Sequence, residues 1–175
     1  IASPSYKEAD FAKVLKKDME EIGFEVIVDN AGEKAGSNTG NLIGFLKGSK
    51  SIETIMFCAH MDTVKPCENI EPIIEDGIIK SKGDTILSAD DKAGIVGILE
   101  GIRYIKDNNI PHGDIEVVFT ICEEVGLLGS KNLDYSKIKS KMAFVFDASG
   151  EIGGVNVQGP AQKLISAKFH GKSAH

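Results

Sequence analysis

Three apolar segments, each followed by acidic or histidine residues, constrain the fold of this sequence more than any other feature. The segments and the residues that follow them are 54–59 with His60-Met61-Asp62, 114–121 with Cys122-Glu123-Glu124, and 142–146 with Asp147. Continuous apolar runs of this length are typical of strands buried on both faces of a sheet. We therefore expect three buried strands whose carboxyl ends carry polar side chains.

Helical patterns separate these strands. Ser5 and Glu8 have the spacing of a capping box, and the apolar residues that follow have helical spacing as far as Gly23. A second helix is expected from Asp90 or Asp91 to Asn108. The remaining expected elements are strands at 24–28 and 41–45, a loop at 30–39, and a hairpin of 70–74 with 78–80 around an Asp-Gly turn. Strands alternating with amphipathic helices indicate an α/β sandwich.

The polar strand ends predict a cation site. In open α/β sheets the carboxyl ends of parallel strands meet at one edge, where ligands bind. The residues expected there are one imidazole and four carboxylates, with two further acids at a helix start: His60, Asp62, Glu123, Glu124 and Asp147, then Asp90 and Asp91. Bare carboxylates repel one another in one place, and a divalent cation is the simplest way to hold them together.

Each motif has an ordinary reading when it is taken alone. His60 and Asp62 alternate on a strand, so one could ligate a metal while the other fixes its tautomer, or both could be incidental. Glu123 and Glu124 point to opposite sides in an extended chain, which predicts one metal ligand and one general base. An isolated acidic pair is more often an exposed loop, and Asp147 alone reads as a turn residue.

Composition narrows the class of protein. The 175 residues suffice for one well-buried domain, and length gives no reason to expect two. The net charge of −6, without a long basic run, predicts no nucleic-acid partner, and no apolar run has membrane-spanning length. Cys58, Cys67 and Cys122 are sparse and odd in number, which favours a reducing, cytoplasmic location. A start without Met or a signal peptide indicates a chain that begins inside a longer protein.

Taken in order, the motifs resemble one family. It is the co-catalytic zinc exopeptidases, which include peptidase T, aminoacylase and carboxypeptidase G, and the resemblance is strongest to the peptidase T branch. The matching blocks are His60-Met61-Asp62-Thr63, Ser88-Ala89-Asp90-Asp91-Lys92-Ala93-Gly94, Glu123-Glu124-Val125-Gly126, Phe146-Asp147 and Gly171-Lys172-Ser173-Ala174-His175. The resemblance implies a three-layer αβα sandwich with a mixed, largely parallel central sheet.

The resemblance also implies a role for each site residue. His60 and Asp147 would bind one metal, Asp90 would bridge two metals, and Glu124 would bind the second. Asp62 would lie behind His60, and Glu123 would be the general base for a water shared by the metals. The peptide between Asp90 and Asp91 would be cis. Aspartate at position 147 is typical of aminopeptidases in the family, so we expect cleavage of short peptides from the N-terminus.

One departure from the family pattern concerns completeness. The family has a further, late His ligand, which nothing in this sequence matches, and a lid domain whose substrate-binding His corresponds to His175. We therefore expect residues 1–160 to be an incomplete catalytic domain and residues 161–175 to begin the lid. The isolated chain should be inactive, and the whole protein should form a homodimer through the lid.

Several alternatives stay open at this point. An amidohydrolase of the same family would remove an acyl group from an amino acid, and a non-catalytic homologue would bind a metal without turnover. A cysteine hydrolase would use Cys122, although a Cys at the end of an apolar run is more often inert. The expected ions are two divalent metals. The ligand types suit zinc, cobalt and manganese alike, and the resemblance favours zinc.

Overall fold

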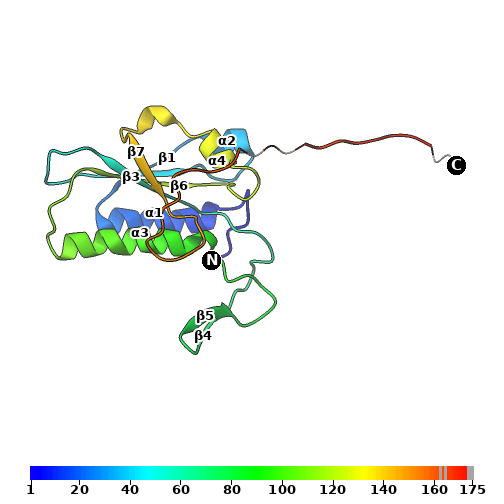
Figure 1. The fold of residues 1–175 in the computed structure, drawn as a ribbon, viewed down its shortest axis with the longest axis horizontal. Coiled ribbons are helices and arrows are strands. Elements are labelled where there is room, and N and C mark those ends of the chain that lie inside the picture. Colours follow the sequence, from blue (N-terminus) through cyan, green and yellow to red (C-terminus); the bar gives the residue numbers. More distant parts are fainter. Residues whose placement is uncertain (162, 164, 173–175) are drawn as a thin grey trace.

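The computed structural model describes residues 1–161, 163 and 165–172 of the chain (Figure 1). Its helices are α1 (Ala9–Ile22), α2 (Ala31–Ala35), α3 (Ala89–Asp107) and α4 (Leu128–Lys131), with a 3-10 turn at Tyr135–Lys137. Its strands are β1 (Glu25–Val28), β2 (Leu42–Leu46), β3 (Ile55–His60), β4 (Pro72–Glu75), β5 (Ile78–Ser81), β6 (Ile115–Thr120) and β7 (Met142–Val145). Among the described residues, no helix is both long and apolar enough to cross a membrane.

The central sheet has five strands in the order β1-β2-β6-β3-β7. β3 pairs in parallel with both β6 and β7, whereas β2 is antiparallel to its two neighbours. Four strands therefore run in one direction and β2 runs against them. This is the mixed, largely parallel sheet that the sequence predicted, and the three strands with polar ends are parallel neighbours as expected.

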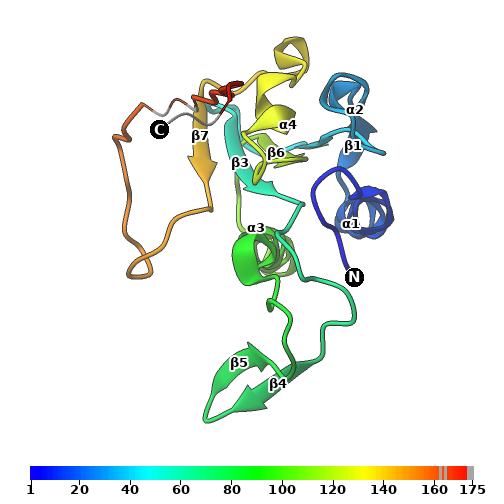
Figure 2. The same cartoon turned by 90° about the vertical axis from the view of Figure 1, so that its right-hand side faces the viewer.

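Helices cover both faces of this sheet. Figure 2 shows α1 and α3 on one side and α2 and α4 on the other, which confirms the three-layer arrangement. Alternate residues of β6 pack on opposite faces of the sheet. Val117 and Phe119 belong to the larger apolar core, and Val118 belongs to a smaller one. β6 is thus buried on both faces, as its apolar sequence indicated.

The start of α1 differs from the capping box that the sequence suggested. The helix begins at Ala9, and neither Ser5 nor Glu8 makes a side-chain cap bond to it. The Ser5 hydroxyl donates to Asp62 instead, and the Glu8 carboxylate accepts from Cys122. Partners distant in sequence have replaced the local bonds, and the start predicted at Ser5 is wrong. The predicted end is confirmed, because Gly23 closes the helix with φ 110°.

Two further expectations need correction. Residues 30–39 contain the short helix α2, which the polar composition concealed. β7 was expected to be buried, but it is the edge strand and its four residues are exposed. The division of the chain near residue 160 stays a prediction.

The predicted hairpin is confirmed. β4 and β5 pair around Asp76 and Gly77, both of which have positive φ, as the tightest hairpin turns require. This hairpin extends away from the sandwich in both views of the fold (Figures 1 and 2). It interrupts the chain between β3 and α3 without entering the central sheet.

Asn41 connects several segments of the chain by hydrogen bonds, close to the polar residues that follow β6. Its side chain is fully buried, and its Oδ1 accepts the main-chain N–H of Ile121 at 3.0 Å. Its Nδ2 donates to the Gly129 oxygen at 3.0 Å and to Asp29 at 2.8 Å. A Cβ at position 129 would lie 2.6 Å from the Asn41 Oδ1, so only glycine permits this approach. One amide therefore joins the starts of β2 and α4 to the end of β6.

We predict that Asn41→Ala lowers the free energy of unfolding of the full-length protein by about 1–3 kcal/mol. The reason is that it leaves buried main-chain groups without partners. Chemical denaturation measures the change. Asn108→Ala is the matched control, because Asn108 is exposed and its Nδ2 makes one bond, to the Tyr104 oxygen. The control should stay within about 0.5 kcal/mol of the wild type. Equal losses in the two variants would contradict the assignment.

Candidate metal centre

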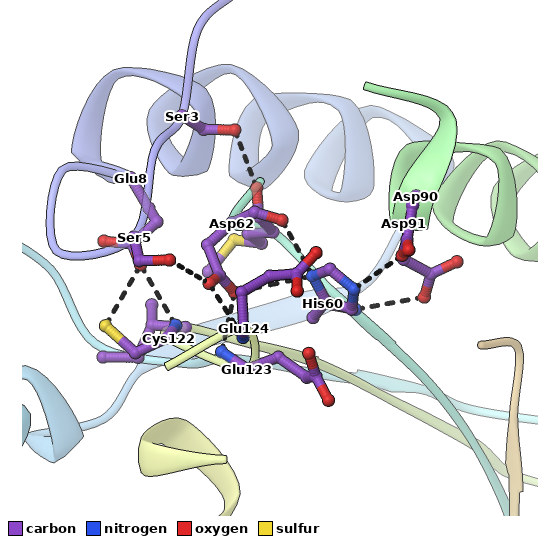
Figure 3. Close-up of polar contacts among 12 residues, drawn as sticks. Ser3, Ser5, Glu8, His60, Asp62, Asp90, Asp91, Cys122, Glu123 and Glu124 are labelled. Atoms are coloured by element: carbon purple, nitrogen blue, oxygen red, sulfur yellow. Dashed lines mark hydrogen bonds and ion pairs between the residues drawn. The ribbon is translucent and has the colours of Figure 1, made fainter. Parts of the chain in front are cut away.

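The polar side chains predicted from the strand ends gather at the C-terminal ends of the parallel strands, and Figure 3 shows His60, Asp90, Glu123 and Glu124 among them. His60 is the last residue of β3, Glu123 and Glu124 follow β6, and Asp147 follows β7. Asp90 comes from the first turn of α3, which packs against β3. The parallel pairing of the three strands and the position of α3 bring these residues together.

His60 is the centre of the cluster. Its side chain is 2% exposed, its Nδ1 lies 2.8 Å from the main-chain oxygen of Asp62, and its Nε2 faces the acids. Asp90 Oδ1 lies 3.0 Å from this Nε2, and Asp147 Oδ1 lies 4.0 Å from it. Burial lowers the pKa of the imidazole, but bonds and charges from Asp62, Asp90 and Asp147 outweigh burial and raise the pKa to about 10. A cation bound at Nε2 would take the place of that proton.

The Asp62 carboxylate connects two loops rather than serving His60 alone. Its Oδ1 accepts the N–H of Glu123 at 2.8 Å, and its Oδ2 accepts the N–H of Glu124 at 3.2 Å. The same Oδ1 is 3.5 Å from His60 Nδ1, farther than the main-chain oxygen of Asp62. The main-chain oxygen is thus the nearer partner that fixes the tautomer, whereas the sequence suggested the carboxylate. Asp62 stays behind His60, fully buried, as expected.

The peptide between Asp90 and Asp91 is cis, as the resemblance implied. Asp90 is exposed toward the cluster, while Asp91 is 4% exposed and accepts the main-chain N–H of His60 at 3.2 Å. Burial raises the pKa of Asp91 to about 7. This positioning contact was not predicted, because the motif contains two adjacent acids and nothing in their order says which one turns inward.

Gly94 is a feature of the sequence that indicates this close packing. A Cβ at Gly94 would lie 2.3 Å from Asp91 Oδ1 and 2.5 Å from the Phe146 oxygen. Any larger residue would push α3 away from the end of β7. The glycine of the Asp90–Gly94 block therefore lets the helix start and the residue before Asp147 approach each other closely.

The acids divide into two groups around the imidazole. Within each group the potential ligand atoms lie within 4.8 Å of one another, and the groups are His60 with Asp90 and Glu124, and His60 with Glu123 and Asp147. The resemblance paired Asp90 with Asp147 at the first metal, whereas here Asp147 groups with Glu123. Four of the predicted acids converge on His60, namely Asp90, Glu123, Glu124 and Asp147, and the metal to which each would belong stays a prediction.

The donor set fits divalent cations. Burial raises the pKa values of Glu123, Glu124 and Asp147, and neighbouring carboxylates raise them further, while His60 opposes the rise. These acids are therefore held in an environment that disfavours their charge unless a positive charge joins them. One imidazole nitrogen with several carboxylate oxygens suits zinc, cobalt or manganese.

Two other candidates fall outside this cluster. Cys122 is fully buried, and burial raises the pKa of its thiol to about 12, with the nearby Glu8 carboxylate adding to the shift. A thiol in this setting is a poor nucleophile, which argues against a cysteine hydrolase. His175, the expected substrate-binding residue, lies outside the described residues, and its role stays a prediction.

Comparison with known proteins gives this geometry a family context. Residues 41–165 match peptidase family M28. The uncharacterised protein YqjE of Bacillus subtilis is 42% identical over 175 residues, covering 100% of this chain and 47% of that protein. Peptidase T of Fusobacterium nucleatum is 30% identical over 207 residues, covering 99% of this chain and 48% of that protein. The chain thus spans about half the length of the curated relatives it matches.

Solved structures show the same fold. Aminopeptidase PepT of Bacillus cereus matches with a TM-score of 0.85 and 45% identity, covering 87% of this chain and 41% of that chain. A tripeptidase of Staphylococcus aureus matches with a TM-score of 0.85 and 36% identity, with the same coverage of 87% and 41%. The resemblance to the peptidase T branch that the motifs indicated is confirmed.

We predict that Asp62→Asn weakens binding of a divalent metal by about 10–100-fold. The asparagine NH2 group would replace one carboxylate oxygen, and a donor would then face the main-chain N–H of Glu123 or Glu124 in place of an acceptor. Competition with a chromophoric chelator measures this affinity in the full-length protein. Asp134→Asn is the matched control, since Asp134 also accepts a main-chain N–H and a serine hydroxyl, from Ser136, but lies beyond α4. The control should bind metal like the wild type. Unchanged affinity in Asp62→Asn would refute the prediction.

Proposed function

Since this chain belongs to peptidase family M28, we propose that it carries most of the metal site of an aminopeptidase that cleaves short peptides, tripeptides foremost. The observation that carries the proposal is the convergence of four acids on His60 within 4.8 Å. Matched proteins named peptidase T, aminopeptidase PepT and tripeptidase support the choice of substrate. The chain covers under half of each of these proteins, so the activity proposed is that of a longer protein.

We assign His60, Asp90, Glu124 and Asp147 as ligands of two divalent metal ions, with zinc as the first choice. Bound ions of this kind polarise a scissile carbonyl and lower the pKa of water. Asp62 holds the loop of Glu123 and Glu124 through two main-chain bonds, of 2.8 Å and 3.2 Å. The ligands therefore come from elements that are fixed to one another before substrate arrives.

Glu123 is the proposed general base. Burial and the charges of Asp147 and Glu124 raise its pKa, which brings a carboxyl closer to the range in which it can both accept and return a proton. Glu123 would take a proton from the attacking water and deliver it to the leaving amine. Glu124, its neighbour, lies with Asp90 on the other side of the cluster, so the two adjacent carboxylates have different surroundings.

The proposal extends to the location of the protein and to its partners. Cys58, Cys67 and Cys122 are all free, which supports a reducing compartment such as the cytoplasm. The partner proposed is a short peptide with a free amino group. Homodimerisation through a lid domain stays a prediction from the resemblance.

We predict that Glu123→Gln lowers kcat for trialanine hydrolysis by about 10²–10⁴-fold, because it removes the proton acceptor. The assay uses the full-length protein with zinc or cobalt, before and after chelation. Metal affinity should change little in this variant. Glu151→Gln, at an exposed position, is the matched control and should retain full activity.

Four outcomes separate the alternatives. Full activity in Glu123→Gln, or turnover that chelation leaves unchanged, would contradict the mechanism. Cleavage of an N-acetylated amino acid with no cleavage of trialanine would favour the amidohydrolase. Metal binding without turnover of either substrate would favour a non-catalytic homologue. Loss of activity in Cys122→Ala, with unchanged metal affinity, would revive the cysteine hydrolase.

A further inference from the structure

A short segment before α1 contacts both loops of the metal centre. We call residues 3–8 the strap. The Ser3 hydroxyl donates to the Met61 oxygen at 2.8 Å, and the N–H of Thr63 donates to the Ser3 oxygen at 3.0 Å. Pro4 and Thr63 form a parallel β-bridge. The strap therefore runs beside the chain that follows His60. Figure 3 shows Ser3, Ser5 and Glu8 on the side of Asp62 and Cys122, away from Asp90 and Asp91.

Ser5 connects the strap to the Asp62 carboxylate. Its hydroxyl donates to Asp62 Oδ2 at 2.7 Å, the same oxygen that accepts the N–H of Glu124 at 3.2 Å. Asp62 is fully buried, so its orientation depends on the donors around it. A fixed Asp62 in turn fixes the main chain of Glu123 and Glu124.

Glu8 reaches the same loop from its other side. Its side chain is fully buried, and its Oε1 accepts the main-chain N–H of Cys122 at 3.1 Å and the thiol of Cys122 at 3.3 Å. The same oxygen accepts the N–H of Tyr6 at 3.1 Å, and Oε2 accepts the hydroxyl of Ser37 at 2.6 Å. This carboxylate is saturated with donors, as burial of such a group requires.

The bond to Cys122 falls where the chain turns. Cys122 has φ 50°, a left-handed conformation that is uncommon for a residue other than glycine. This turn sets the direction in which Glu123 and Glu124 leave β6. Glu8 makes no cap bond to α1, so helix capping does not account for burying it there.

We propose that Glu8 and Ser5 are positioning residues that hold the Glu123-Glu124 loop at a fixed place relative to His60. The inference rests on the proposed function only for its effect on metal binding, and the positioning itself is a property of the folded chain. The strap thereby links the end of β3 to the end of β6 from outside the sheet, in addition to the ladder between the two strands.

Amide hydrogen exchange in the metal-free, full-length protein tests the positioning directly. We expect residues 121–126 to exchange about 10-fold faster in Glu8→Ala, because the Cys122 N–H loses its acceptor. Glu8→Gln should restore slow exchange, since its oxygen can accept from Cys122 while its amide donates to Ser37. Unchanged exchange of this segment in Glu8→Ala would overturn the proposal.

Cobalt binding tests the consequence for the site. We expect Glu8→Ala and Ser5→Ala to weaken Co²⁺ affinity by about 10-fold or more and to alter its visible absorption spectrum, with Glu8→Gln close to wild type. Glu116→Ala is the matched control, because Glu116 is 1% exposed and its carboxylate also accepts main-chain N–H groups, from Lys139 and Ser140. It lies toward the other end of β6 and should lose stability with an unchanged spectrum.

Two results would overturn the inference. One is that Glu8→Ala and Glu116→Ala change the amide exchange of residues 121–126 and the cobalt spectrum equally. The other is that Glu8→Gln fails to restore the slow exchange and the wild-type spectrum. If Glu8→Ala does not fold, Ser5→Ala decides through the same two measurements. Peptide hydrolysis enters neither measurement. A protein that binds cobalt without cleaving trialanine would contradict the proposed function alone, and a wild type that binds no cobalt would leave hydrogen exchange to decide the positioning.

Discussion

The parallel pairing of β3 with both β6 and β7 is the constraint on which the candidate metal centre depends. The ladder sets His60 opposite Thr120, and the chain leaving β6 and β7 then passes the same edge of the sheet. The N–H of Phe146 donates to the Cys58 oxygen at 2.9 Å, which carries the pairing up to the residue before Asp147. Convergence is thus a property of topology, and the identities of the side chains decide what the edge can bind.

Convergence places the acids in a partly buried site, where loss of water disfavours their charged form. Hydrogen bonds from the surrounding residues offset this cost. Asp62 illustrates the point: burial alone would raise its pKa, but His60, Ser5 and the N–H of Glu123 hold it below the usual range. Among the described residues no group donates to the side chains of Glu123 and Glu124, and their pKa values are raised. The cluster therefore contains one buried carboxylate that is held by several hydrogen bonds, and further acids whose charge the imidazole of His60 offsets only in part.

Sequence patterns predicted what is local or periodic. The apolar runs, the Asp-Gly turn and Gly23 each specify their structure within a few residues, and the corresponding elements are confirmed. Patterns failed where a distant partner replaced a near one, since Ser5 and Glu8 looked like a capping box but bond to Asp62 and Cys122. The inward turn of Asp91 was also out of reach, because it depends on how α3 meets β3. Exposure of β7 depends on its place at the sheet edge, which its composition does not reveal.

The strap has a consequence for the order of events in folding. Its bond from Cys122 to Glu8 joins residues 114 positions apart, and closing such a loop is entropically costly, so contacts of this kind form late. Apart from that of Asp90, the side chains of the cluster come from the ends of β3, β6 and β7, so the pairing of these strands is what brings them together. Small domains stapled by a metal behave differently, because there the ion drives folding. A metal bound at this cluster would instead meet side chains that the paired strands already hold near one another.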